Sequence, residues 1–157
     1  MIEMHEAIER LIVHEGLKLK PYKCPAGYLT IGVGRNVETN PITEEEERVV
    51  GAWERGITEN GAKYLLKNDI LKAHKNCKKF VECYKNLDDE RQYALLDMCF
   101  NLGIIGLLKF RKMLSAMEIG DYRGAAKECL NSKYAKEVGK RAKRIARIIE
   151  TGVFSYD

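Results

Sequence analysis

One short stretch, in which the hydrophobic pattern changes, constrains the fold most. Residues 2–14 carry apolar side chains at helical spacing, and this pattern stops at Gly16. Between residues 18 and 34, β-branched and aromatic residues alternate with turn formers, as in Gly27-Tyr28-Leu29-Thr30-Ile31-Gly32-Val33-Gly34. This change predicts a helix followed by a small, glycine-rich antiparallel hairpin or three-stranded sheet.

The rest of the chain carries patterns typical of helices. Thr43 and Glu46 form a capping box that opens a short helix ending near Trp53, and Thr58 caps a longer helix. Further helices are predicted over residues 89–101, 107–117, 122–130 and 140–149. We therefore expect an α+β fold that is mainly α.

Length and composition indicate a single soluble globular domain. The chain has 157 residues, of which 45% are hydrophobic and 32% charged. Such a chain is too apolar to be disordered and too charged to lie inside a membrane. Its N-terminus has neither the basic region nor the apolar run of a secretory signal, so we expect synthesis in the cytoplasm.

The cysteine content and the distribution of charge predict the state of the thiols and the kind of polymer that the surface would attract. The five cysteines are an odd number without a C-x-x-C pair, which predicts reduced thiols rather than a disulfide framework or a zinc ribbon. The net charge of +4 is unevenly placed, with four consecutive glutamates at 44–47 and many Lys and Arg residues over 133–147. A basic C-terminal face would attract an anionic polymer.

The candidate chemistry lies where the first helix meets the hairpin. Glu15 stands at the C-terminus of the helix, where the helix dipole disfavours a second negative charge. A carboxyl group that keeps its proton can protonate a glycosidic oxygen, which contributes about 10² to 10⁴ in rate. A single Glu before a Gly does not identify a function. The spacing is more specific: eight residues separate Glu15 from Cys24, and five separate Cys24 from Thr30.

This spacing resembles the catalytic motif of the phage lysozyme family, the T-even phage lysozymes and their prophage relatives. That motif is Glu, eight residues, Asp or Cys, five residues, Thr. The flanks are similar as well: Glu-Gly-Leu at 15–17, Tyr-Lys at 22–23 and Gly-Tyr-x-Thr-Ile-Gly-x-Gly at 27–34. Phe100-Asn101-Leu102-Gly103 and Arg141-Ala142-Lys143-Arg144 extend the resemblance over essentially the whole chain.

The resemblance implies a lysozyme-like fold in one domain over residues 1–157, with the active-site cleft between two lobes. The small β-containing lobe would cover about 14–57 and the connecting helix about 58–79. The helical lobe would cover about 80–157 together with the N-terminal helix. We expect a monomer.

The resemblance also implies a glycoside hydrolase, an N-acetylmuramidase that lyses the cell wall. It would cut β-1,4 bonds between N-acetylmuramic acid and N-acetylglucosamine in peptidoglycan. Glu15 would be the proton donor, Cys24 the second catalytic position, and Thr30 the residue that helps to place the attacking water. Phe100 and Asn101 resemble substrate-binding residues of the cleft wall, and Arg141 resembles an arginine that supports the acid.

Peptidoglycan glycan strands are the expected partner, with no cofactor, no metal and no nucleic acid. The enzyme would be made in the cytoplasm, which is the host's if the gene is carried by a phage, and would act in the periplasm or cell wall. A separate holin or delivery system would bring it there.

Two residues depart from the best-known relatives. Cys24 stands where they have Asp, and a thiol with an ordinary pKa of about 8.5 is mostly neutral at pH 7. Cys24 could ionise in the site, act mainly by position, or leave the water to Thr30, and the sequence leaves these open. Arg35 stands where relatives often carry His, and the sequence gives no consequence of that change.

Other functions are compatible with parts of the sequence. Cys24 with His14 could form a thiol hydrolase, or with His14 and His5 a metal site, although the spacing favours neither. The basic amphipathic stretch 136–147 could bind nucleic acid or a membrane. A catalytically weak wall-binding protein of the same fold is the remaining alternative.

Overall fold

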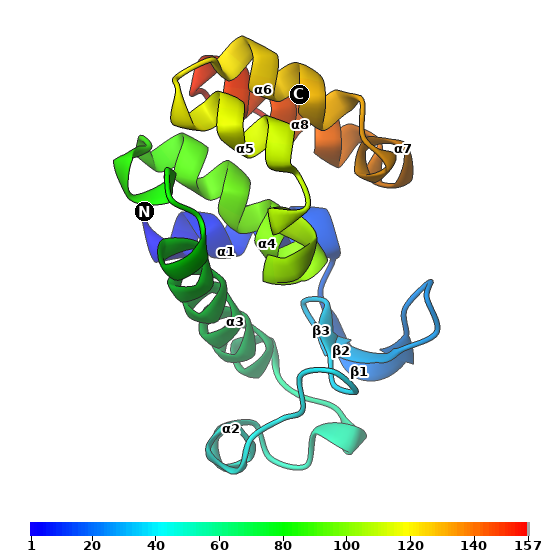
Figure 1. Ribbon diagram of the computed structural model, residues 1–157. Helices are drawn as coiled ribbons and strands as arrows, with labels where there is room; N and C mark the ends of the chain where they lie inside the picture. Colours follow the sequence, from blue (N-terminus) through cyan, green and yellow to red (C-terminus); the bar gives the residue numbers. More distant parts are fainter. Residues whose placement is uncertain (157) are drawn as a thin grey trace. The chain divides into compact units, whose positions relative to one another are not determined.

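A computed structural model describes residues 1–156, and the chain divides into two compact units. The first unit is Met4–Ile70, and the second is Met1–Glu3 together with the chain from Leu71 onward. The predicted α+β, mainly helical architecture is confirmed: one small antiparallel sheet is accompanied by helices along most of the chain (Figure 1). Among residues 1–156 no single helix is long and apolar enough to cross a membrane. Two consecutive helices, Asp89–Leu108 and Arg111–Glu118, would be long and apolar enough together, but the chain bends by 99° between them.

The first unit contains the predicted helix and the predicted sheet. The sheet is three-stranded and antiparallel in the order β1-β2-β3. Gly16 has a φ of +78° and donates its N–H to the carbonyl of Ile12, which ends the first helix at the predicted position. The elements are α1 (Met4–Glu15), β1 (Lys18–Lys23), β2 (Leu29–Gly32), β3 (Arg35–Asn36), α2 (Glu44–Val50), the 3₁₀ turn η1 (Trp53–Arg55) and the beginning of α3 (Glu59–Phe80).

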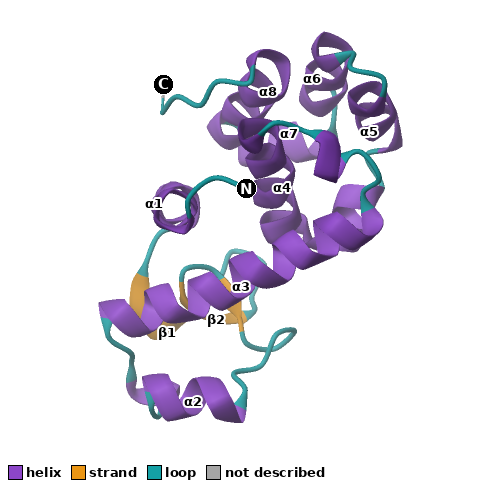
Figure 2. Cartoon of the chain, turned by 90° about the vertical axis from the view of Figure 1, so that its left-hand side faces the viewer, coloured by secondary structure: helices purple, strands orange, loops and turns teal. Residues whose placement is uncertain are grey.

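The core of this unit lies between the sheet and α3, which runs beside the strands in Figure 2. It is formed by five buried residues: Ile31, Val37, Ile57, Ala62 and Leu65. Ala62 and Leu65 are three residues apart and so lie on one face of α3, opposite Ile31 of β2. A Cβ on Gly32 would meet that of Ala62 at 3.6 Å, so strand and helix approach closely.

The capping box of α2 is confirmed, but the predicted end of this helix is wrong. The Thr43 hydroxyl accepts the N–H of Glu46, and the Glu46 carboxylate accepts the N–H of Thr43. The helix ends at Val50 because Gly51 takes a φ of +78°. Trp53 belongs to the separate turn η1.

In its described residues the second unit contains helices and connecting segments but no strand. After the last turns of α3 it contains η2 (Tyr84–Asn86), α4 (Asp89–Leu108), α5 (Arg111–Glu118), α6 (Tyr122–Leu130), α7 (Lys133–Val138) and α8 (Lys140–Thr151). The predicted helix over 89–101 extends to Leu108, with a break at Gly103 where φ is +76° and ψ is 164°. α7 was not predicted; Ser132 caps it by accepting the N–H of Ala135.

Helix α8 shows how the basic C-terminal stretch is used. Its apolar residues, such as Ala142, Ile145 and Ile149, are buried, whereas Lys143 and Arg147 are exposed. The helix packs against α6, α4 and α7. A buried apolar face is not available for insertion into a membrane, so α8 is a core helix with a solvated basic face.

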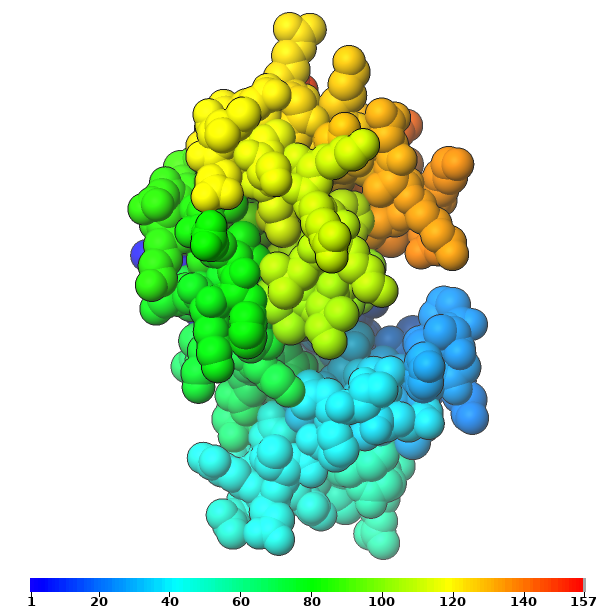
Figure 3. All heavy atoms as spheres, viewed as in Figure 1, coloured from blue at the N-terminus to red at the C-terminus, as the bar shows by residue number. Residues whose placement is uncertain are grey.

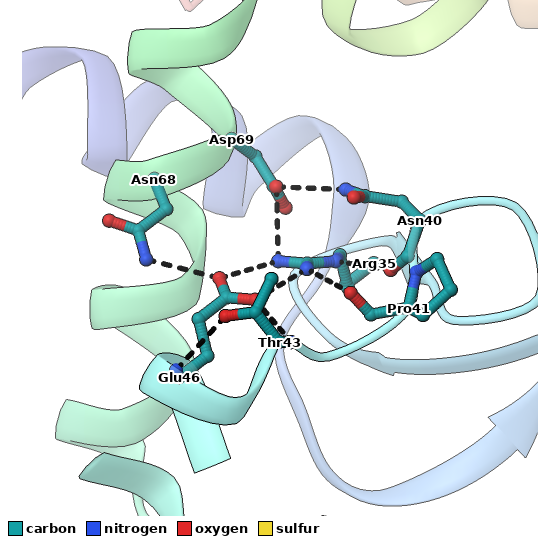
Figure 4. A network of polar contacts seen from close by, with 7 residues as sticks. All are labelled: Arg35, Asn40, Pro41, Thr43, Glu46, Asn68 and Asp69. Carbon is teal, nitrogen blue, oxygen red and sulfur yellow. Dashed lines mark hydrogen bonds and ion pairs between the residues drawn. The ribbon is translucent and has the colours of Figure 1, made fainter. Parts of the chain in front are cut away.

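A buried ion-pair network joins β3, α2 and α3 in the first unit (Figure 4). The Arg35 guanidinium donates to both carboxylate oxygens of Glu46, at 2.8 and 3.1 Å, and to Oδ1 of Asp69 at 3.1 Å. It also donates to the carbonyls of Asn40 and Pro41, at 2.8 and 3.0 Å. Five hydrogen bonds thus use the whole donor capacity of the guanidinium.

The pKa of Glu46 reflects this network. Burial alone would raise the pKa, but hydrogen bonds from Arg35, Asn68 and the Thr43 N–H outweigh it and lower the pKa from an ordinary 4.5 to about 2. Such a drop corresponds to about 3 kcal/mol of stability at neutral pH. This contribution is complete above about pH 4.5 and is lost as the pH falls toward 2.

We therefore expect Glu46→Gln to lower the free energy of unfolding at pH 6 and to flatten its decline between pH 4.5 and 2. Urea unfolding at several pH values measures both effects. Glu44→Gln is the matched control, because Glu44 lies on the same helix with a side chain 94% exposed. Equal pH dependence in the wild type and Glu46→Gln would contradict the assignment.

Candidate active site

Glu15, the predicted acid, is the last residue of α1, and its carboxyl group lies beside Gly34, in the space that a side chain there would need. A Cβ on Gly34 would lie 3.0 Å from Glu15 Oε2 and 3.2 Å from its carboxyl carbon. Gly34 also has a φ of +66°, which a side chain would disfavour. Glycine at position 34 thus satisfies both the conformation of this backbone and the space that the carboxyl group occupies.

The hairpin of β1 and β2 places Cys24 and Thr30 near each other. Tyr22 pairs with Thr30 across the two strands, and Lys23 pairs with Leu29. The turn closes through the N–H of Cys24 on the Tyr28 carbonyl at 2.9 Å and the N–H of Gly27 on the Cys24 carbonyl at 2.8 Å. The turn residues are exposed, and the hairpin is visible in blue on the face shown in Figure 3.

The tight turn gives Cys24 an anion-stabilising environment. The backbone N–H of Tyr28 is the main cause that lowers the pKa of the Cys24 thiol, and the N–H groups of Ala26 and Gly27 add to it. The Thr30 hydroxyl lowers this pKa further, while partial burial opposes the shift. Successive main-chain N–H groups in a turn form a concavity that favours a negative charge.

Thr30 lies in β2, and its hydroxyl hydrogen-bonds back to the turn. It is only 2% exposed, and its hydroxyl donates to the Tyr28 carbonyl at 2.9 Å. The same hydroxyl lowers the pKa of Cys24. The hydroxyl has a single proton, so a Cys24 thiolate competes for it with the carbonyl. Thr30 therefore supports Cys24 directly.

Tyr22 is a neighbour of both predicted catalytic groups. Burial raises the pKa of its phenol, and the charges of Glu15 and Cys24 raise it further. Lys18 Nζ lies 4.2 Å from the centre of its ring. The sequence pointed to Tyr22 only through the Tyr-Lys pair that flanks the motif. The structure places it directly opposite Thr30 in the hairpin.

The other predicted site residues belong to the second unit. Arg141 Nε donates to Asp97 Oδ1 at 2.8 Å, and both side chains are buried. Asn101 has a buried Oδ1 that accepts no hydrogen bond within residues 1–156, and Phe100 beside it is partly buried. Support of Glu15 by Arg141 and sugar binding by Phe100 and Asn101 stay predictions.

The alternative chemistries of Cys24 gain no support from its surroundings. Within the described residues, main-chain N–H groups and a hydroxyl lower the pKa of Cys24, and no histidine is among these causes. No group of three His, Cys, Asp or Glu residues in the described part of the chain could hold a metal ion. All five cysteines are free thiols.

We expect iodoacetamide to alkylate Cys24 before the other cysteines, because Cys77, Cys83, Cys99 and Cys129 are buried. The pH midpoint of its alkylation rate should lie below the ordinary pKa of a thiol, and Thr30→Val should raise that midpoint. Mass spectrometry after short exposures gives the rates. Thr39→Val, an exposed site, is the control; an unchanged midpoint in Thr30→Val would contradict the role of the hydroxyl.

Comparisons with known proteins match this chain over most of its length. It is 32% identical over 155 residues to a protein named "Probable T4-type lysozyme 1" of Dictyostelium discoideum, covering 90% of this chain and 91% of that protein. It is 31% identical over 143 residues to an endolysin of Acyrthosiphon pisum secondary endosymbiont phage 1, covering 88% and 86%. The match to the pre-baseplate central spike protein of Enterobacteria phage T4, 32% over 157 residues, covers 92% of this chain but only 27% of that protein.

The family model described as phage lysozyme matches residues 13–147. This range contains the end of α1, the sheet, α2, α3 and the helices of the second unit as far as α8. It includes Glu15, Cys24 and Thr30 in the order and spacing of the motif. The chain therefore belongs to the phage lysozyme family.

Proposed function

We propose that this protein is an N-acetylmuramidase that hydrolyses β-1,4 bonds between N-acetylmuramic acid and N-acetylglucosamine in peptidoglycan. The observation that supports the proposal is the hairpin, in which Thr30 pairs with Tyr22 and its hydroxyl lowers the pKa of Cys24. Tyr22 links the two reactive groups, because the charges of Glu15 and Cys24 both act on its phenol. Family membership supports the same class of reaction.

Glu15 is the general acid of the proposed reaction. It donates a proton to the glycosidic oxygen as the bond breaks, and the sugar develops positive charge. The absence of a side chain at Gly34 leaves room for the carboxyl group, because a Cβ there would lie 3.0 Å from Glu15 Oε2. A fixed acid needs less reorganisation in the transition state than a mobile one.

Cys24 acts as a thiolate in the proposed reaction. Glycosidases of this kind pair the acid with a second anionic group, which activates water or faces the oxocarbenium-like transition state. The turn N–H groups and the Thr30 hydroxyl favour the charged form of Cys24. Of the alternatives that the sequence left open, ionisation of Cys24 is therefore the one that we adopt, with Thr30 as its support.

The proposed partner is the glycan strand of peptidoglycan, and the enzyme acts as a monomer in the periplasm or cell wall after delivery by a holin or another route. No cofactor takes part in the reaction. The names of relatives, which include an endolysin and T4-type lysozymes, support this assignment.

Attraction to an anionic wall polymer is a second function favoured by a specific observation. Lys140, Lys143 and Arg147 are exposed on α8, while the apolar face of the helix is buried. Surface cations raise the local concentration of a polyanion and the rate of association. This binding would act together with hydrolysis.

We expect wild type to release muramic-acid reducing ends from purified peptidoglycan, and Glu15→Gln to lower the rate at least about 100-fold. The amide cannot donate the proton, while its size preserves the fold. Borohydride reduction followed by mass spectrometry identifies the new ends. Pelleting with peptidoglycan measures whether the variant still binds.

Glu9→Gln is the matched control, because Glu9 is an exposed glutamate on the same helix. It should cut at the wild-type rate. Binding of wild type without cleavage would replace the proposal by a wall-binding role. Lysis of cells that persists in folded Glu15→Gln would instead favour membrane disruption.

We expect the wild-type rate to rise with pH as Cys24 ionises, because the thiolate is the active form. In Cys24→Asp this rise should move to a lower pH, since a carboxylate ionises near pH 4. Cys24→Ala should be slower at every pH. The pH profile of kcat measures this difference, and an alanine variant as fast as the wild type would remove Cys24 from the mechanism.

A further inference from the structure

We propose that Arg35 is a positioning residue for Glu15: its buried clamp fixes the backbone of Gly34, beside which the Glu15 carboxyl group lies. The clamp is the guanidinium with its partners Glu46, Asp69, Asn40 and Pro41. The inference deepens the function proposed above and rests on Glu15 being the acid.

The first step is the rigidity of the clamp. Arg35 is 4% exposed, and its five hydrogen bonds reach a loop, α2 and α3 (Figure 4). Asn68 donates to Glu46, and Asn40 donates to Asp69, so both acidic partners are themselves fixed. A planar fork bound on three sides cannot shift without breaking several charge-assisted bonds.

The second step is the short path from the clamp to the acid. Gly34 is bonded directly to Arg35 in the chain, and Arg35 pairs with Ile31 across β2 and β3. On the other side of the turn, Gly32 packs against Ala62 of α3. The turn between the two strands is therefore held at both ends, and Gly34 cannot move independently of Arg35.

The third step is the contact itself. A Cβ built on Gly34 would lie 3.0 Å from Glu15 Oε2, so the carboxyl group occupies the space that a side chain at Gly34 would need. A displacement of Gly34 by about 1 Å would change where the carboxyl group lies, and errors of that size can lower a rate about 100-fold. The clamp and the acid are thus coupled through one peptide.

This coupling explains a residue for which the sequence offered no consequence. A buried ion pair is costly to desolvate, and well-packed apolar side chains are often as stabilising. A guanidinium offers a fixed direction toward several partners, which an apolar side chain does not. Arg35 then holds the Gly34 backbone in place in addition to stabilising the unit.

The test compares Arg35→Lys, which keeps the charge but loses the fork, with Leu66→Ala. Leu66 is a buried residue of α3 that forms no hydrogen bond with Arg35, so its truncation lowers Tm without opening the clamp. Tm is measured for each variant, and kcat and KM are measured on soluble glycan oligomers well below the lowest Tm. If Arg35→Lys does not fold, Asp69→Asn replaces it in the test, because this variant weakens the contacts of Arg35 and Asn40 with Asp69 and keeps those of Arg35 with Glu46.

We expect Arg35→Lys to lower kcat about 10- to 100-fold and to leave KM within about twofold, because the acid is displaced while binding is retained. Asp69→Asn should give a smaller fall in kcat in the same direction. Leu66→Ala should keep kcat within about twofold of the wild type. Equal kcat values for Arg35→Lys and Leu66→Ala would overturn the inference and leave Arg35 a purely stabilising residue.

A second readout needs no substrate. Amide hydrogen exchange at residues 32–34 should be faster in Arg35→Lys than in Leu66→Ala, because only the former frees the turn. Equal exchange would overturn the clamp even if kcat had fallen. If the wild type does not cut the glycan, the proposed function is refuted. The exchange rates would still show whether Arg35 holds the turn at residues 32–34.

Discussion

The first unit depends on the buried guanidinium of Arg35. Its sheet is too small to be stable by itself, since the three strands have six, four and two residues. The desolvation of a buried cation must be offset, and two carboxylates and two carbonyls do so at hydrogen-bond distance. Because these partners come from α2, α3 and the loop before them, one side chain ties the short third strand to the rest of the unit.

The candidate site uses main-chain groups to favour a negative charge on Cys24. The N–H groups of the tight turn lower the pKa of the thiol, whereas a carboxylate ionises without such help. A residue without a side chain has a similar part at Glu15, because Gly34 leaves space for the carboxyl group. Both groups are therefore set by the geometry of the hairpin and its following turn, which is why a small sheet is sufficient to carry the proposed chemistry.

Local patterns predicted most of the elements, and the misses have local causes. The capping box at Thr43, the stop at Gly16 and the long helix after Thr58 follow from short-range hydrogen bonds and periodicity. The continuation of α4 beyond Gly103 was missed, because a glycine with positive φ interrupts the helix without ending it. The six-residue helix α7 is too short to show periodicity, and only its serine cap marks it.

The sequence by itself determined the fold class, the family resemblance and the order of Glu15, Cys24 and Thr30, because motif spacing and hydrophobic period are written along the chain. It left open whether Cys24 carries a charge and what Arg35 does. The tertiary structure shows which N–H groups lower the pKa of Cys24 and which partners the Arg35 guanidinium binds, since these partners are 5 to 34 residues away in the chain. Electrostatic effects of this kind depend on distance in space, which sequence separation does not give.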